Sequence, residues 1–219
     1  MVDPDLIPAI KEAIKQNEIG DQSPYKLSYA RLGVSGASFG VFQGDTNVSD
    51  VARQTLRKAL AANGVDDATI NRILGLVSQR LPNGNPLSPH DTEVADGALS
   101  SPAGKQLVDA MDQSLFLIVI RDVNACIAAA QSQNFLINSV ALLYMAVWVN
   151  MTGPPTLLTK FLAGSNELGV LPPVGPTVTV QDIQTYLHAS RYFILHPRNF
   201  LHMQESVEAA IPLLPGAIA

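Results

Sequence analysis

Two acidic residues, Glu18 and Asp45, flank the part of the sequence whose residue types best suit catalysis. The segment between them is rich in glycine, a residue that permits tight turns and close approach of the backbone to a ligand. Its glycines are Gly33, Gly36, Gly40 and Gly44. Glycoside hydrolysis needs two carboxyl groups, one to protonate the leaving oxygen and one to act as base or charge stabiliser. Glu18 and Asp45 are therefore a candidate catalytic pair.

Glu18 is expected in the last turn of a helix that begins at Asp3-Pro4. Its apolar face carries Leu6, Ile7, Ile10 and Ile14. Glu18 follows Ile14 by four residues, so it extends this face, and Gly20 is the expected C-terminal cap. Partial desolvation and the negative end of the helix dipole both raise a carboxyl pKa, as a general acid requires. The alternative is a solvated last-turn glutamate, and for Asp45 an ordinary turn or cap residue.

A second pattern, Gly36-Ala37-Ser38-Phe39-Gly40, matches the G-x-S-x-G of a serine-hydrolase nucleophile elbow. Three of the histidines that follow it, His188, His196 and His202, lie downstream in the order that such a mechanism needs. This mechanism requires a parallel sheet with the serine on a strand-to-helix turn, and no succession of apolar strands is present. The pattern therefore favours a backbone-shaping or hydrogen-bonding role for Ser38. A serine esterase remains a third hypothesis.

The histidines and the cysteine do not have metal-ligand spacing. His196 and His202 are six residues apart, no H-E-x-x-H occurs, and the single cysteine, Cys126, lies in an apolar helical pattern. The glycines are not followed by the Gly-Lys-Ser/Thr of a P-loop. The sequence predicts no metal and no cofactor.

The segment GASFGVFQGD, preceded by a helix ending in glutamate, resembles the lysozyme-like superfamily. It is most similar to goose-type lysozymes and related lytic transglycosylases, in which an FG-x-x-Q-x-D segment lines the cleft opposite the glutamate. The resemblance implies that Glu18 is the general acid and Asp45 the second carboxylate. It implies that Ser38 and Gln43 line the adjacent subsite. The later stretch Asn150-Met151-Thr152-Gly153-Pro154 is similar to the far cleft wall of that superfamily.

By the same resemblance, Tyr144 and Asn150 would face the sugar. Tyr25, Tyr29 and Tyr144 are candidates for stacking on sugar rings. The implied activity is a glycoside hydrolase acting on a β-1,4-linked amino-sugar polymer, with peptidoglycan as the leading substrate. A chitosanase, a chitinase or another glucan-active enzyme of the same fold is the alternative. A non-catalytic structural or binding module of lysozyme-like fold is the alternative from another class.

Composition limits the partners. The 219 residues are 47% apolar and 15% charged with a net charge of −5, which gives no basic stripe for nucleic acid. The longest apolar runs, such as Leu115–Ile120, fall short of the ~20 residues of a membrane helix, so no membrane insertion is expected.

Asp3 and Asp5 do not fit a secretory leader. The chain is expected to be made in the cytoplasm and to reach a cell wall after export or release, as an endolysin or antibacterial effector does. A delivery partner or an immunity protein would fit such a role.

The expected architecture is mainly α, a lysozyme-like α+β fold with a small β element at residues 25–45. Helices are predicted at 49–60, 66–77, 90–99, 101–131, 135–150, 156–162, 180–189 and 197–210. The helix 101–131 contains the unbroken LFLIVI and is predicted to be the buried central helix. Residues 1–219 are expected to form one catalytic domain, with a lobe boundary near the Pro/Gly/Asn-rich loop 81–89.

Overall fold

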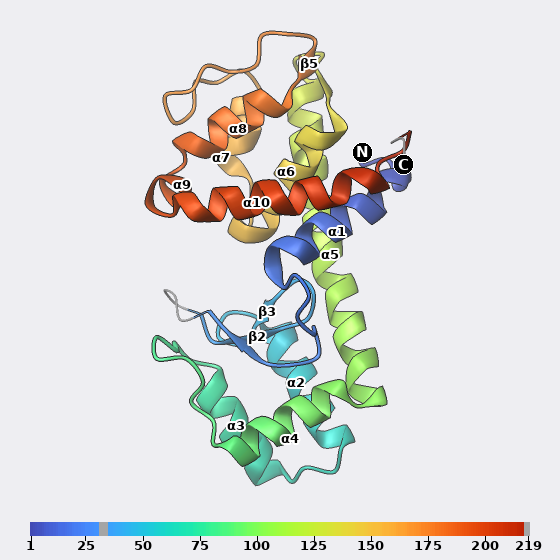
Figure 1. Cartoon of the computed structure of the whole chain (residues 1–219), viewed down its shortest axis with the longest axis vertical. Helices are drawn as coiled ribbons and strands as arrows, with labels where there is room; N and C mark the ends of the chain where they lie inside the picture. The colour runs from blue at the N-terminus through green and yellow to red at the C-terminus, as the bar shows by residue number, and fades with distance from the viewer. Residues whose placement is uncertain (31–34, 217–219) are drawn as a thin grey trace. The chain divides into compact units, whose positions relative to one another are not determined.

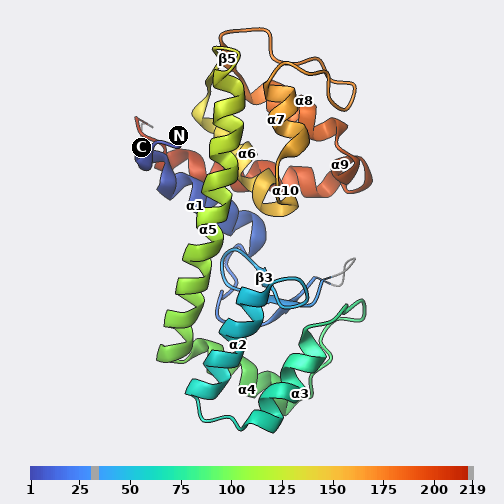
Figure 2. The same cartoon turned by 180° about the vertical axis from the view of Figure 1, so that it is seen from behind.

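The computed structural model describes residues 1–30 and 35–216, so Gly33 of the glycine-rich segment lies outside the described residues. The fold is mainly helical with small sheets, and the prediction of a mainly α chain with a β element near its N-terminus is confirmed. The chain divides into two compact units. The first contains residues 1–20 and the chain from Leu117 onward, and the second is Asp21–Phe116. Helix α5 (Pro102–Gln131) begins in the second unit and ends in the first (Figure 2).

The first unit is built around α1, α6 and α10, which pack on one another (Figure 1). Its helices are α1 (Ile7–Glu18), α6 (Ser139–Thr152), α7 (Thr156–Leu162), α8 (Val180–Ala189), α9 (Arg191–Leu195) and α10 (Pro197–Ala210). Short 3₁₀ turns precede α1 (η1, Pro4–Leu6) and follow α10 (η2, Ile211–Leu213). Two strands, β4 (Leu136–Ile137) and β5 (Thr177–Val178), pair in parallel. Helix α6 is buried along most of its length, which suits its almost entirely apolar sequence.

The second unit places an antiparallel three-stranded sheet beside three helices. The strands are β1 (Ser28–Tyr29), β2 (Ala37–Phe39) and β3 (Gly44–Asp45), in that order across the sheet. The helices are α2 (Asp50–Ala62), α3 (Asp67–Val77) and α4 (Pro89–Ser100). The first part of α5 contributes Val108 and Met111 to the shared core, in which Phe39 is fully buried. This core anchors the glycine-rich hairpin.

Three helical segments begin at side-chain caps. Asp3, Ser49 and Asp66 each accept a backbone N–H in the first turn of η1, α2 and α3. At the end of α1, the N–H of Gly20 donates to the carbonyl of Lys15, and Gly20 has φ +53. The left-handed conformation explains why a glycine stands two residues after Glu18, next to the C-cap residue Ile19.

The central helix differs from its prediction. The apolar run within α5 was expected to be buried on several sides, but Leu117 is 59% exposed and Ile118 48% exposed. Both lie where the chain passes from the second unit to the first. The prediction of burial is therefore wrong for these residues, because an unbroken apolar run cannot indicate which faces of a helix meet other elements. By length and hydropathy alone α5 also meets the criterion for a membrane span, although Arg121 and Asp122 lie within it.

A helix start, a strand pair and a short helix also differ from the sequence prediction. Helix α6 begins at Ser139 rather than near residue 135, because the Asn138 side chain accepts the N–H groups of Val140 and Ala141 and ends the preceding strand β4. The β4–β5 pair and the short α9 were not predicted. The loop 81–89 lies inside the second unit, whereas the two units divide at residues 20–21 and 116–117.

Candidate active site

Glu18 is the last residue of α1, at the position that the sequence predicted. The buried face of this helix is formed by Ala9, Ile10, Ala13 and Ile14. Because Glu18 is one turn beyond Ile14, it lies on the same side as this face, and its side chain is partly buried.

The Glu18 carboxyl group is held by two amides. The Nδ2 of Asn150 donates to Oε1 at 2.9 Å, and the Nδ2 of Asn17 donates to the same oxygen at 3.3 Å. Within the described residues of the first unit, Oε2 has no hydrogen-bond partner. When the group is neutral, both amide donors favour a proton on Oε2, where it is available to an incoming acceptor.

Burial raises the pKa of Glu18, while the hydrogen bonds from Asn150 and Asn17 and the charge of His202 oppose that rise. Desolvation is the largest of these effects. Burial therefore favours the protonated form of Glu18, and Asn150, Asn17 and His202 limit how far its pKa rises. This is the electrostatic setting that suits a general acid.

The Glu18–Asn150 contact joins residues 132 positions apart in the chain. Asn150 lies in the last turn of α6, which packs against α1 (Figure 1). The resemblance placed Asn150 beside the sugar, and in the structure its amide donates to the Glu18 carboxyl group. His202 of α10 was not predicted as part of the site. Its Nε2 is 3.0 Å from the carbonyl oxygen of Asn17, and no local sequence pattern signals that proximity.

Asp45 closes the glycine-rich hairpin in the second unit. It lies in β3 opposite Ser38 of β2. Its Oδ1 accepts the backbone N–H of Gly36 at 3.0 Å and that of Asn47 at 2.7 Å. A Cβ added at Gly36 would lie 2.6 Å from the carbonyl oxygen of Val77, so only glycine fits there. The Asp45 carboxylate therefore has a structural role in this turn, and its orientation is fixed by backbone donors.

Asp112 of α5 supports the other end of the hairpin and was not identified from sequence. Its carboxylate accepts the backbone N–H groups of Val41 at 2.8 Å and Phe42 at 3.2 Å. Burial, with a smaller contribution from Asp109, raises the pKa of Asp112 to about 6, against the opposing effect of these two hydrogen bonds. Gly40 packs so closely on Asp112 that a Cβ there would lie 2.4 Å from Oδ1.

Gln43 and Ser38 are held within the same hairpin. Gln43 has φ +48, its Nε2 donates to the Gly40 carbonyl at 3.0 Å, and its Oε1 accepts the Ser28 hydroxyl at 2.7 Å. Ser38 is 8% exposed, and its carbonyl oxygen accepts the same Ser28 hydroxyl. The FG-x-x-Q-x-D segment thus forms one hydrogen-bonded turn. The burial of Ser38 disfavours the esterase hypothesis, which needs an accessible hydroxyl.

The three tyrosines proposed for sugar stacking have different environments. Tyr25 donates its hydroxyl to Asp109 at 2.9 Å, and the Lys105 ammonium lies 5.3 Å from its ring centroid. Tyr29 packs against the core of the second unit. Tyr144 is 3% exposed, and its hydroxyl accepts the Gln184 amide at 2.9 Å. A ring this buried presents no face to a sugar, so the stacking role predicted for Tyr144 does not fit the structure.

The candidate residues are divided between the two units. Glu18, Tyr144 and Asn150 belong to the first, and Tyr25, Tyr29, Ser38, Gln43 and Asp45 belong to the second. Among residues 1–30 and 35–216, no three His, Cys, Asp or Glu side chains come together as metal ligands would. The chain matches no protein-family model, no curated protein and no solved structure.

Proposed function

We propose that the protein is a glycoside hydrolase that cleaves a β-1,4-linked amino-sugar polymer, with peptidoglycan as the leading substrate. The observation that carries the proposal is the environment of Glu18. Its carboxyl group is partly buried at the end of α1, its pKa is raised by that burial, and both amide donors contact a single oxygen. Glu18 would protonate the leaving glycosidic oxygen from Oε2.

Asp45 is the proposed second carboxylate, positioning water or stabilising the positive charge of the oxocarbenium-like transition state. Backbone donors on Oδ1 fix its orientation, and within the described residues Oδ2 has no hydrogen-bond partner. Tyr25, Tyr29, Gln43 and Asn150 are the proposed sugar contacts, and Ser38 shapes the subsite through its backbone. Asn150 has the additional task of holding Glu18.

The deciding experiment compares wild type with Glu18→Gln on purified peptidoglycan and on chitosan, with products identified by mass spectrometry. Glutamine retains an Oε1 acceptor for Asn150 and so preserves the fold, but it cannot donate a proton as an acid. Glu12→Gln is the matched control, because it makes the same chemical change two turns earlier on α1, where Glu12 contacts Lys15 and Gln16.

The expected result is reducing-end products from peptidoglycan with wild type and Glu12→Gln, and none with folded Glu18→Gln. Anhydro-sugar ends would assign the enzyme to the lytic transglycosylases and remove the need for Asp45 as base. Chitosan cleavage would select the alternative substrate. Activity retained in Glu18→Gln would contradict the assignment of the acid. No product from either polymer would favour the non-catalytic module.

A further inference from the structure

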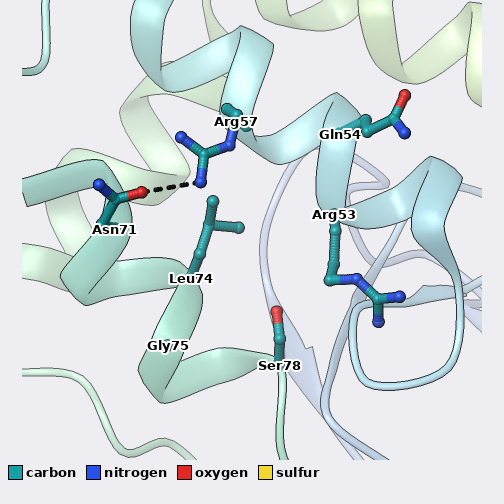
Figure 3. Close-up of a pocket in the computed structure, with 7 residues that line it drawn as sticks. All are labelled: Arg53, Gln54, Arg57, Asn71, Leu74, Gly75 and Ser78. Carbon is teal, nitrogen blue, oxygen red and sulfur yellow. Dashed lines mark hydrogen bonds between the residues drawn. The ribbon is translucent and has the colours of Figure 1, made fainter. Parts of the chain in front are cut away.

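The second unit contains a groove between α2 and α3 that takes no part in the proposed catalysis. Its volume is about 410 Å³. Five of its seven lining residues carry polar or charged side chains, and none is acidic (Figure 3). The lining residues are Arg53, Gln54, Arg57, Asn71, Leu74, Gly75 and Ser78.

Two arginines dominate the groove. Arg53 and Arg57 are four residues apart on α2, so they project from the same face of the helix. Arg53 is fixed by its Nη1, which donates to the carbonyl oxygens of Thr46 at 2.8 Å and Asn47 at 2.9 Å, and its Nη2 pairs with Asp50. This arginine therefore has a set orientation at the edge of the groove.

Arg57 is less engaged. Within the described residues its only side-chain partner is Asn71, whose Oδ1 accepts from Nη2 at 2.8 Å (Figure 3). A guanidinium group has five N–H donors, so most of those of Arg57 have no acceptor among the residues that the structure describes. The bond to Asn71 also orients the Asn71 amide, whose NH₂ group is a further donor beside the arginine. The groove thus presents hydrogen-bond donors together with the charge of Arg57, whereas the charge of Arg53 is paired with Asp50.

Ser78 provides a second, independent observation. Its Oγ is buried, lines the groove, and has no hydrogen-bond partner among the described residues. Figure 3 shows this hydroxyl directed into the groove between Leu74 and Arg53. Buried hydroxyl groups normally have a partner, so this hydroxyl is a spare donor at the wall of the groove.

Gly75 keeps the groove open. It lies within α3, where glycine is less favourable than alanine, and a Cβ added there would meet nothing within 4 Å. No packing requirement therefore explains this glycine.

We infer that this groove binds an oxyanion, the carboxylate or phosphate group of a small ligand or of a polymer side group. Guanidinium groups match the geometry of both anions and form paired, charge-assisted hydrogen bonds with them. Arg57 supplies most of the available donors, the Asn71 amide lies beside it, and Ser78 supplies a buried hydroxyl, while the Arg53 guanidinium, paired with Asp50, forms the edge of the groove. This inference does not depend on the proposed hydrolase activity.

The test is an NMR titration of the full chain with inorganic phosphate and, separately, with acetate, each against sodium chloride at equal ionic strength. The signals to follow are the Nε–Hε groups of Arg53 and Arg57 and the backbone amides of Gly75 and Ser78. Saturable shifts at these groups with phosphate or acetate, absent with chloride, are expected. The anion that binds more tightly identifies the ligand as phosphate-bearing or carboxylate-bearing.

Three variants make the test specific. Arg57→Gln removes the free guanidinium and is expected to weaken binding about ten-fold or more. Lys58→Gln makes the same charge change at the next residue of α2, outside the groove, and is expected to leave the affinity within about two-fold. Ser78→Ala removes a hydroxyl that has no hydrogen-bond partner in the described part of the chain, so the fold is expected to stay intact, and weaker anion binding would show that Oγ contacts the anion. Chemical shifts that do not saturate with phosphate or acetate would overturn the inference. Equal losses of anion affinity in Arg57→Gln and Lys58→Gln would also overturn it.

Discussion

Asp112 allows a sharp test of the forces that hold the glycine-rich hairpin. Two effects oppose each other at this carboxyl group. Burial favours the neutral form, and the N–H groups of Val41 and Phe42 favour the ionised form. With 8% of the residue exposed, burial dominates, and the pKa is raised from an ordinary value of 3.8 to about 6.

The sign of the effect on stability follows from proton linkage. Between about pH 4 and pH 6 the folded protein binds a proton at Asp112 that the unfolded chain has released. The free energy of unfolding therefore falls as the pH rises through this window. A difference of roughly two pKa units corresponds to a loss of about 3 kcal/mol in the free energy of unfolding. This loss is complete above the pKa of Asp112 in the folded protein and absent below its pKa in the unfolded chain.

The perturbation is Asp112→Asn, which cannot ionise. Its amide oxygen can accept one of the two backbone N–H groups, while its NH₂ group faces the other, at a pH-independent cost of about 1–3 kcal/mol. Urea unfolding of both proteins, followed by far-UV circular dichroism from pH 4 to pH 8, gives the difference in unfolding free energy at each pH. We expect wild type to lose up to about 3 kcal/mol relative to the variant as the pH rises.

Asp21→Asn, an exposed carboxylate of the same unit, controls for the change from acid to amide. The opposite slope, with wild type gaining stability relative to Asp112→Asn as the pH rises, would show that the two N–H donors outweigh burial. A flat difference would show that the two effects cancel. Either result would refute the reasoning.

Two further predictions concern the same hairpin and the acid. Gly40→Ala should destabilise the protein by more than the ~1–2 kcal/mol of a left-handed residue, because Gly40 has φ +83 and its added Cβ would lie 2.4 Å from Asp112 Oδ1. Gly64→Ala is the control, because Gly64 has φ +75 but open space around it, so the substitution has only the cost of the left-handed backbone. Urea unfolding measures the loss of unfolding free energy in each variant. Equal losses in Gly40→Ala and Gly64→Ala would contradict the close contact between residue 40 and Asp112. Asn150→Leu should raise the pKa of Glu18 further, because it removes a hydrogen bond that favours the carboxylate. A carbon-detected NMR titration of the Glu18 carboxyl group measures this directly, and an unchanged or lower pKa would show that the amide has no such effect.

Local sequence signals determined much of the secondary structure. Asp3, Ser49 and Asp66 specify helix starts through their own side chains, and the spacing of Ile10 and Ile14 specifies the buried face of α1. The position of Glu18 at the end of that helix followed from the same pattern with Gly20 as cap. These features depend on residues a few positions apart, so a single sequence is enough to predict them.

The tertiary structure decided what each candidate side chain touches. The bond from Asn150 to Glu18 joins two helices that are 132 residues apart, and Asp112 reaches Val41 across 71 residues. Nothing in the spacing of these residues encodes the contacts. The same limit explains the incorrect expectation for Leu117 and Ile118, because hydropathy states what a side chain prefers but not which faces of a helix other elements cover. The periodicity of α1 predicted where Glu18 lies, and only the packing of α1 against α6 and α10 determined which side chains hold its carboxyl group.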